Sequence, residues 1–296
     1  MPISIHRLTK KFPNGKGIFD VSFDVAEGEV FGFLGPNGAG KSTTIRHLMG
    51  FMKPTSGSAT INRLNAWKKS AEIQQSVGYL PGETAFLEGM NGLEFLRLLA
   101  GMRKIKQIKR QKELIERFQF DVKTPIRKMS KGMKQKVGIV AAFMHDPQVL
   151  ILDEPTSGLD PLMQNLFVDL VKEEKKRGKT ILMSSHSFSE IDRTSDRVGI
   201  IKAGQLVAIE EIRKLQALQR KIFQVTVKTS GDIEKIKNTP LEIVQIDGHQ
   251  IRIAIQGDYE SFVKSISECG INSIDIHRQN LEDVFMHFYN KDGDQS

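Results

Sequence analysis

A glycine-rich segment with a lysine and a serine at its end, GPNGAGKS (residues 35–42), has the spacing G-x-x-x-x-G-K-S. Glycines let the backbone bend so that successive N–H groups point at phosphate oxygens. An apolar run precedes the segment and a helix-like pattern follows it, so the positive end of a helix would face the same phosphates. The sequence therefore predicts a phosphate-binding loop between a strand and a helix.

The side chains of this loop have separate expected roles. The ammonium of Lys41 would contact the β and γ phosphates of a nucleotide, and the hydroxyl of Ser42 would bind Mg²⁺. The whole predicted nucleotide-binding segment consists of Gly35, Pro36, Asn37, Gly38, Ala39, Gly40, Lys41, Ser42 and Thr43.

Two acidic residues, which could bind a metal ion or act as a general base, follow the apolar run in VLILDEP (149–155). A buried strand delivers its last residues to the ligand-binding edge of a parallel sheet, where the phosphate-binding loop also lies. Asp153 would contact the Mg²⁺ ion. Glu154 would act as the general base that polarises an attacking water.

The elements that must position these residues are indicated by alternating apolar runs and helical patterns. Short apolar runs at 77–80, 149–152, 180–183 and 198–201 are separated mostly by helical segments. This order predicts an α/β fold with a mainly parallel core sheet. Residues of roughly 84–145 interrupt the alternation and read as a helical insertion. A hairpin turn is expected at Ala203–Gly204.

The sequence changes character near residue 220. Strictly alternating segments in 223–229, 241–257 and 271–279 surround a helix-like piece. We expect a domain over residues 1–215 and a small α+β accessory domain over 220–290, joined by a charged helix or linker at 210–221.

Composition limits the remaining classes of function. Hydrophobic residues make up 39% of the 296 residues and charged residues 26%, which is typical of a globular chain. One cysteine excludes an internal disulfide framework. No apolar run approaches the ~20 residues that cross a bilayer, so we expect no membrane span. Much of the net charge of +8 lies in residues 102–112. This basic segment is either a solvated helix face or a surface held near lipid headgroups.

Three further motifs follow in a fixed order: MSKGMKQK (129–136), SGLD (157–160) and SSHSFSE (184–190). With the phosphate-binding loop and the acidic strand end they cover roughly residues 3–215. In this order they resemble the signature, D-loop and switch-histidine region of the ABC ATPase family. The resemblance implies a P-loop NTPase fold and ATP hydrolysis with Mg²⁺.

The resemblance also implies roles for further residues. Two subunits would pair head to tail as a homodimer, and each ATP would lie between the phosphate-binding loop of one and the signature of the other. Ser130 and Gly132 would bind the γ-phosphate across this interface, and Asp160 would link the two sites. His186 would bond the γ-phosphate and hold Glu154 in place. Phe12 resembles the aromatic residue that stacks on adenine.

Two departures from the family pattern affect these roles. The signature usually reads Leu-Ser-Gly-Gly-Gln, and here Met129, Lys131 and Met133 replace three of its residues. In the loop after residues 77–80, Gly82 takes the place of the usual glutamine and Glu83 follows it. Either Glu83 substitutes for that glutamine or the coupling works through the backbone.

The tail NLEDVFMHF (280–288), GYLPGE (78–83) and the form of the signature resemble ATPases of bacterial exporters of drugs and peptide antibiotics. This resemblance implies a separate transmembrane permease, attachment to the cytoplasmic face of the membrane and no nucleic acid. The alternative is an ABC-type ATPase that acts on nucleic acid or ribosomes, which the basic charge permits. A P-loop kinase or GTPase would lack the signature and D-loop order, and a non-hydrolysing regulatory subunit would not need Glu154.

Overall fold

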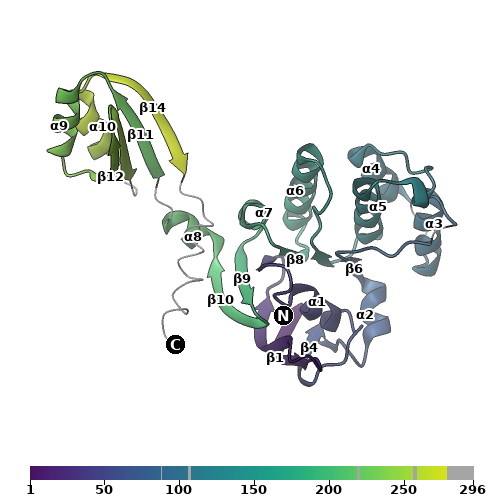
Figure 1. Cartoon of the computed structure of the whole chain (residues 1–296). Helices are drawn as coiled ribbons and strands as arrows, with labels where there is room; N and C mark the ends of the chain where they lie inside the picture. The colour runs from purple at the N-terminus through teal and green to yellow at the C-terminus, as the bar shows by residue number, and fades with distance from the viewer. Residues whose placement is uncertain (88, 106–107, 219–220, 256–258, 279–296) are drawn as a thin grey trace. The chain divides into compact units, whose positions relative to one another are not determined.

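The computed structural model describes all residues except 88, 106–107, 219–220, 256–258 and 279–296 (Figure 1). The chain divides into two compact units, Met1–Ile212 and a second unit that begins at Arg213. The tail motif NLEDVFMHF lies outside the described residues. The two units are described separately below.

The first unit contains a mainly parallel six-stranded sheet, which confirms the predicted fold class. Only β10 runs antiparallel, in a hairpin with β9 whose turn is formed by Ala203 and Gly204, as predicted. The strands, in spatial order, are β10 (Gln205–Glu211), β9 (Arg197–Lys202), β3 (Val30–Leu34), β8 (Thr180–Ser185), β7 (Val149–Asp153) and β6 (Val77–Leu80).

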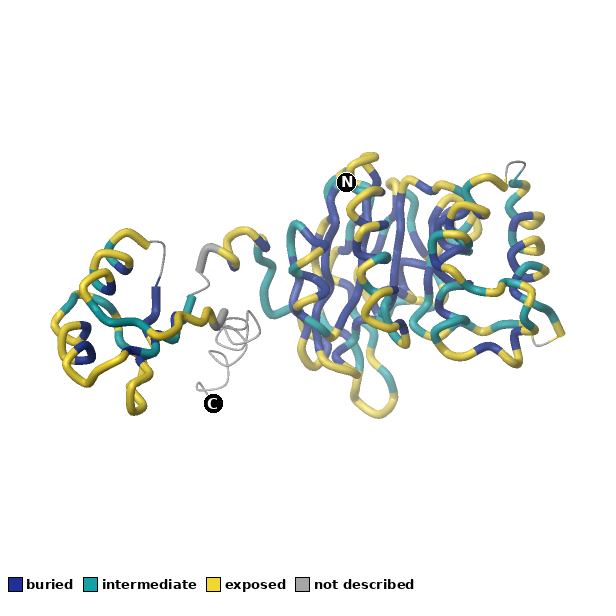
Figure 2. The backbone as a smooth tube through the Cα atoms, turned by 90° about the horizontal axis from the view of Figure 1, so that it is seen from above, coloured by how far each residue is buried: buried dark blue, intermediate teal, exposed yellow. Residues whose placement is uncertain are grey.

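The central strands β3, β7 and β8 are buried at every position (Figure 2). Such strands are covered on both faces and read as continuous apolar runs, which is why the sequence identified them. Their carboxyl ends meet at one edge of the sheet, so the segments after residues 34, 153 and 185 are brought together there. All three of these segments carry predicted site residues.

A second, antiparallel sheet that the sequence did not predict packs against the core sheet. Apolar side chains of this sheet and of the core sheet form one apolar core, in which Phe23 stacks on Phe31 with ring centroids 4.9 Å apart. Its strands, in spatial order, are β2 (Gly17–Val25), β1 (Ile3–Lys11), β4 (Ser56–Ile61) and β5 (Leu64–Asn65). The sequence 18–25, in which apolar residues alternate, therefore belongs to this sheet and not to the parallel one.

Helices cover the sheets and form the insertion (Figure 1). Helix α1 (Lys41–Leu48) contributes Ile45 and Leu48 to the core shared by the two sheets. The remaining helices of the core are α2 (Ser70–Ser76), α6 (Pro161–Lys176) and α7 (Phe188–Thr194). Between β6 and β7 lie α3 (Gly92–Met102), α4 (Lys109–Phe118), the short 3₁₀ helix η1 (Ile126–Lys128) and α5 (Lys131–Phe143).

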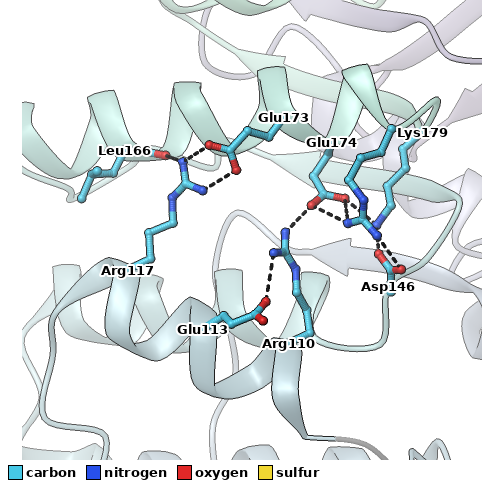
Figure 3. Close-up of polar contacts among 9 residues, drawn as sticks. Arg110, Glu113, Arg117, Asp146, Leu166, Glu173, Glu174 and Lys179 are labelled. Carbon is cyan, nitrogen blue, oxygen red and sulfur yellow. Dashed lines mark hydrogen bonds and ion pairs between the residues drawn. The ribbon is translucent and has the colours of Figure 1, made fainter.

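The inserted helix α4 is tied to the core helix α6 by charged side chains (Figure 3). Arg117 on α4 donates to both carboxylate oxygens of Glu173, at 2.6 and 2.9 Å, and to the carbonyl of Leu166 at 3.3 Å. Bidentate pairs of this kind fix orientation as well as distance. This contact therefore helps to set the position of the insertion on the core.

Glu174, the next residue of α6, is fully buried and is surrounded by three cations. Arg110 from α4 reaches it, Arg177 binds both of its oxygens at 3.0 Å, and the Lys179 ammonium lies 2.5 Å away (Figure 3). Arg177 and Lys179 also pair with Asp146. A buried carboxylate needs such pairing because its desolvation is costly.

The basic stretch 102–112 is partly used inside the protein. Arg103 donates to the carbonyls of Gln75 and Val77 at 3.3 and 3.2 Å, and Arg110 pairs with Glu174. The stretch is therefore not a uniformly solvated helix face, because at least these two cations attach the insertion to the core.

The second unit is a β-α-β-β-α-β arrangement with one antiparallel sheet, the split βαβ topology. Its helices lie against the sheet face that carries Phe223, Val225 and Ile253. The elements are β11 (Lys221–Val227), α9 (Ser230–Lys237), β12 (Glu242–Asp247), β13 (Gln250–Ile255), α10 (Tyr259–Ser267) and β14 (Ile271–Arg278). A short helix, α8 (Ile212–Leu218), precedes them where a charged helix or linker was expected.

The other face of this sheet is polar. Arg252 on β13 donates to Gln224 at 3.2 Å and to Gln245 at 3.0 Å, and Gln224 donates to Gln250 at 3.3 Å. No Phe, Tyr or Trp side chain of the described strands lies on this face, because Phe223 alternates to the helix side.

Candidate functional site

The phosphate-binding loop connects β3 to α1 through a backbone that only glycine fits at critical points. A Cβ on Gly35 would lie 2.4 Å from the carbonyl oxygen of Ile201. Gly40 has φ +114° immediately before the helix, a conformation that favours glycine. Between them, Pro36, Asn37 and Gly38 are exposed, so this part of the loop is open to a ligand.

Lys41, the first residue of α1, is buried at 5% exposure and its ammonium is held by three oxygen atoms. It donates to the carbonyls of Gly35 at 2.6 Å and Pro36 at 3.3 Å, and it lies 3.0 Å from Glu154 Oε1. The ammonium is therefore fixed beneath the loop. Ser42 and Thr43 follow it in the first turn and are half-buried.

The acidic strand end is organised by one serine of the neighbouring strand. Ser184 on β8 donates its hydroxyl to Asp153 Oδ1 at 2.5 Å and accepts the backbone N–H of Glu154 at 3.0 Å. Asp153 ends β7 and is buried, whereas Glu154 has φ +47°. The left-handed backbone at Glu154 turns the chain away from the strand, so the two carboxylates point in different directions.

His186 completes the group by contacting the other oxygen of Glu154. Its Nδ1 lies 2.7 Å from Glu154 Oε2, and its side chain is 59% exposed. One carboxylate thus joins Lys41, at the start of α1, to His186, which directly follows β8. The structure brings together Lys41, Glu154 and His186, which the sequence predicted from separate motifs.

Behind His186 lies a buried carboxyl group that the sequence did not single out. Glu190 Oε2 accepts the Ser185 hydroxyl at 2.6 Å, and Ser185 Oγ in turn accepts the N–H of Ser187 at 2.9 Å. Burial raises the pKa of Glu190 to about 7, and the charge of Glu154 adds to the rise. These bonds fix the turn that carries His186.

The loop after β6 approaches Asp153 through Gly82. A Cβ at Gly82 would lie 3.3 Å from Asp153 Oδ2, so the backbone itself is next to this carboxylate. Glu83 is exposed. On the same strand, burial and then the charge of Asp153 raise the pKa of Tyr79 to about 12. The contact of this loop with the acidic strand end is therefore made by the backbone of Gly82.

The signature residues form a second group with the SGLD segment. Ser130 caps α5 by accepting the N–H of Met133 at 3.2 Å, and Met129 is buried. A Cβ at Gly132 would lie 2.7 Å from the carbonyl oxygen of Gly158. Asp160 caps α6 by accepting the N–H of Met163 at 3.0 Å and is exposed. Both predicted polar residues therefore begin helices.

Phe12 lies directly after β1, in the turn that leads to β2. Its N–H donates to the carbonyl of Lys16 at 2.8 Å, and its side chain is half-buried. Its assignment to adenine stacking remains a prediction.

The donors at the strand end suit a hard divalent cation. Across the described ranges, no three His, Cys, Asp or Glu side chains gather into a metal site of their own. Asp153 supplies a carboxylate and Ser42 a hydroxyl. Mg²⁺ is commonly held by one or two carboxylates together with substrate phosphates, so this donor set fits Mg²⁺ that arrives with a nucleotide.

Comparison with known proteins gives the family. Residues 18–157 match the family model described as ABC transporter. The bacitracin transport ATP-binding protein BcrA of Bacillus licheniformis is 36% identical over 292 residues, which cover 94% of each chain. The linearmycin resistance ATP-binding protein LnrL of Bacillus subtilis is 32% identical, covering 90% of this chain and 91% of the relative.

The chain belongs to the ABC transporter ATP-binding proteins. A solved structure of an ATP-binding subunit of an ABC transporter matches this ABC ATPase with a TM-score of 0.67 and 31% identity, covering 74% of this chain and 93% of that one. The resemblance predicted from the motifs is thereby confirmed. In the described part of the chain, none of the helices has the length and apolar character needed to cross a bilayer.

Proposed function

We propose that this ABC ATPase hydrolyses ATP with Glu154 as general base and so powers export of a small molecule or peptide through a separate transmembrane subunit. The observation that carries the proposal is the contact of Glu154 with both Lys41 and His186, at 3.0 and 2.7 Å. The carboxylate that we propose as the base thus contacts both a phosphate-binding cation and a histidine, and the phosphate-binding loop beside it is open to a ligand.

Each residue has a defined role in this reaction. Lys41, Ser42, Thr43 and the backbone N–H groups of Asn37, Gly38 and Gly40 bind and orient the triphosphate. Glu154 accepts a proton from water as the water oxygen bonds to the γ-phosphorus and the bond to ADP breaks. His186 contacts the γ-phosphate and keeps the carboxylate of Glu154 turned toward the water.

Mg²⁺ at the site would neutralise charge that develops on the β and γ phosphates. Ser42 and Asp153 are the residues that would hold it. Ser184 fixes the orientation of Asp153 through its 2.5 Å hydrogen bond, and a Cβ at Gly82 would make a tight contact of 3.3 Å with the other oxygen of Asp153.

Two copies of the chain would form the complete site. The exposed Ser130 and the half-buried Gly132 lie at the start of α5, where first-turn N–H groups favour anions. We assign them to the γ-phosphate bound by the other copy, with Asp160 between the two sites and Phe12 against adenine.

The membrane partner and the cargo class are inferred from the relatives. BcrA is named for bacitracin transport and LnrL for linearmycin resistance, and both match this chain over almost its whole length. We therefore place the protein at the cytoplasmic face of the membrane, held there by its transmembrane partner. The names of these relatives favour this role over an action on nucleic acid or ribosomes.

The test is purification of the tagged chain, co-expressed with the neighbouring membrane-protein gene, followed by ATPase assays in detergent. We expect a polytopic membrane protein to co-purify. Glu154→Gln should retain the complex and lower turnover by about 10²–10⁴-fold, the usual contribution of a positioned base. Intact turnover in Glu154→Gln would exclude Glu154 as the base, and recovery of ribosomes or RNA alone would exclude the transport role.

A further inference from the structure

The signature helix α5 contacts the chain segment that follows Glu154. Gln135, in the second turn of α5, is buried at 6% exposure. Its side-chain amide Nε2 donates to the carbonyl of Pro155 at 2.8 Å and lies 3.4 Å from the carbonyl of Glu154. A buried amide that donates to two consecutive carbonyl groups holds that stretch of backbone against the helix.

The first turn of α5 makes a second contact, with Gly158. The carbonyl of Gly158 lies so close to Gly132 that a Cβ there would be 2.7 Å from it. The methylene groups of Lys131 pass over Gly158, whose own Cβ would lie 2.9 Å from Lys131 Cγ. Gly158 has φ +78°, so the segment turns here. The stretch between Glu154 and Asp160 is thus attached to α5 at both of its ends.

This attachment matters because Glu154 has a backbone conformation that it does not favour. A residue other than glycine with φ +47° is strained by roughly 1–2 kcal/mol and stays in place only when its surroundings hold it. On its amino side, the N–H of Glu154 is bound by Ser184 at 3.0 Å. On its carboxyl side, the Glu154 carbonyl accepts the Ser157 N–H at 3.1 Å and faces Gln135.

We propose that Gln135 is a positioning residue that connects the signature helix to the general base of the same chain. Through its amide, the position of α5, whose first turn carries Ser130 and Gly132, sets the backbone of Glu154 and hence the direction of its carboxylate. The inference rests on the proposed role of Glu154. It gives each ATP site a direct mechanical connection to the signature helix that serves the other site.

The experiment compares ATP turnover and ATP affinity in the full chain co-purified with its membrane partner. In Gln135→Met the side chain keeps its length and loses its N–H donor, and in Gln135→Glu it keeps its shape and loses the same donor. We expect each variant to lower kcat by about 10–100-fold, the effect of misplacing a reacting group by ~1 Å. The dissociation constant for a fluorescent ATP analogue should stay within about twofold, because the phosphate-binding loop is unchanged.

Gln74→Met is the matched control, because Gln74 Nε2 also donates to a backbone carbonyl, that of Met49, at 2.8 Å. We expect it to leave kcat unchanged while losing thermal stability comparable to that lost by Gln135→Met. A lower kcat in Gln74→Met, or an unchanged kcat in both Gln135 variants, would overturn the inference.

Combination with Glu154→Gln separates this inference from the proposed function. If Gln135 acts through Glu154, adding Gln135→Met to Glu154→Gln should lower the residual turnover no further, since residues in one unit are not additive. Multiplicative losses would show that Gln135 acts by another route. Full turnover in Glu154→Gln alone would refute the proposed function itself. Loss in Glu154→Gln with normal kcat in the Gln135 variants would refute only the inference.

Discussion

The carboxylate of Glu154 is shared between two groups, with Oε1 3.0 Å from the Lys41 ammonium and Oε2 2.7 Å from His186 Nδ1. Lys41 is the cation that we assign to the β and γ phosphates. Phosphate oxygens and Glu154 therefore compete for one buried ammonium. Nucleotide binding at Lys41 would loosen its hold on Glu154 and leave that carboxylate to His186 and the attacking water.

Lys41→Met should weaken nucleotide binding by roughly 10–100-fold, because it removes charged hydrogen bonds worth about 1.5–3 kcal/mol. The measurement is titration with a fluorescent ATP analogue. Lys10→Met is a control of the same chemistry outside the site, since Lys10 donates to the carbonyl of Lys53 at 3.0 Å. Equal affinities for wild type and Lys41→Met would remove the assigned role.

His186→Ala should lower turnover by about 10²-fold or more while ATP binding persists, because it removes one of the two groups that hold Glu154. Steady-state rates and ATP titration together distinguish this from a loss of binding. Ser189→Ala, three residues further along the chain and exposed, should keep wild-type turnover. Retention of full activity in His186→Ala would show that Glu154 needs no histidine.

Glu190 should make stability depend on pH near neutrality. Its pKa is raised from 4.5 to about 7, so the stability that this group contributes is full below pH 4.5 and is lost as the pH rises through about 7. Relative to Glu190→Gln, wild type should lose about 3 kcal/mol between pH 4.5 and 8. Urea unfolding of both proteins across this range measures the difference. A constant difference would show that Glu190 does not titrate there.

Adjacent glutamates of α6 should differ sharply in their contribution to stability. Glu174→Gln leaves Arg110, Arg177 and Lys179 around a neutral buried group and should cost about 3–5 kcal/mol. Glu173→Gln loses an ion pair with Arg117 whose carboxylate is 52% exposed, and should cost at most about 1 kcal/mol. Denaturant unfolding of the two variants compares them. Equal losses would mean that burial of Glu174 does not govern its energetics.

The sequence predicted the parts of the site in which local pattern and chemistry coincide. β7 is an uninterrupted apolar run that ends in two acids, and the loop before Lys41 is defined by glycine spacing. Each of these two signals is contained in a few consecutive residues. They therefore required no knowledge of which strands pair.

The antiparallel sheet could not be predicted in the same way. β4 (SGSATI) has few apolar residues, and Gly57 in it has φ +75°. Its place is set by pairing with β1, whose partner residues lie 47 to 58 positions earlier and whose register shifts between His6 and Thr9. Only this long-range pairing makes the segment a strand.

Polar residues that act through tertiary contacts were also missed. Gln135 occupies an ordinary helical position, and nothing near it in the sequence marks it as buried against Pro155. Glu174 lies in the segment EEKKRGK, which is typical of a solvated helix end. In the structure it is fully buried and contacts three cations. A helical pattern gives the face of a helix but not what packs on it.

Because Glu154 has a left-handed backbone, the residue that gives the most stable protein at this position differs from the residue that gives the most active one. Glycine or asparagine would adopt φ +47° with less strain, so their introduction at residue 154 would relieve part of roughly 1–2 kcal/mol. A variant library sorted only for heat resistance should therefore accumulate inactive chains changed at this position. A library sorted for ATP turnover should return glutamate there, at the expense of a small part of the melting temperature.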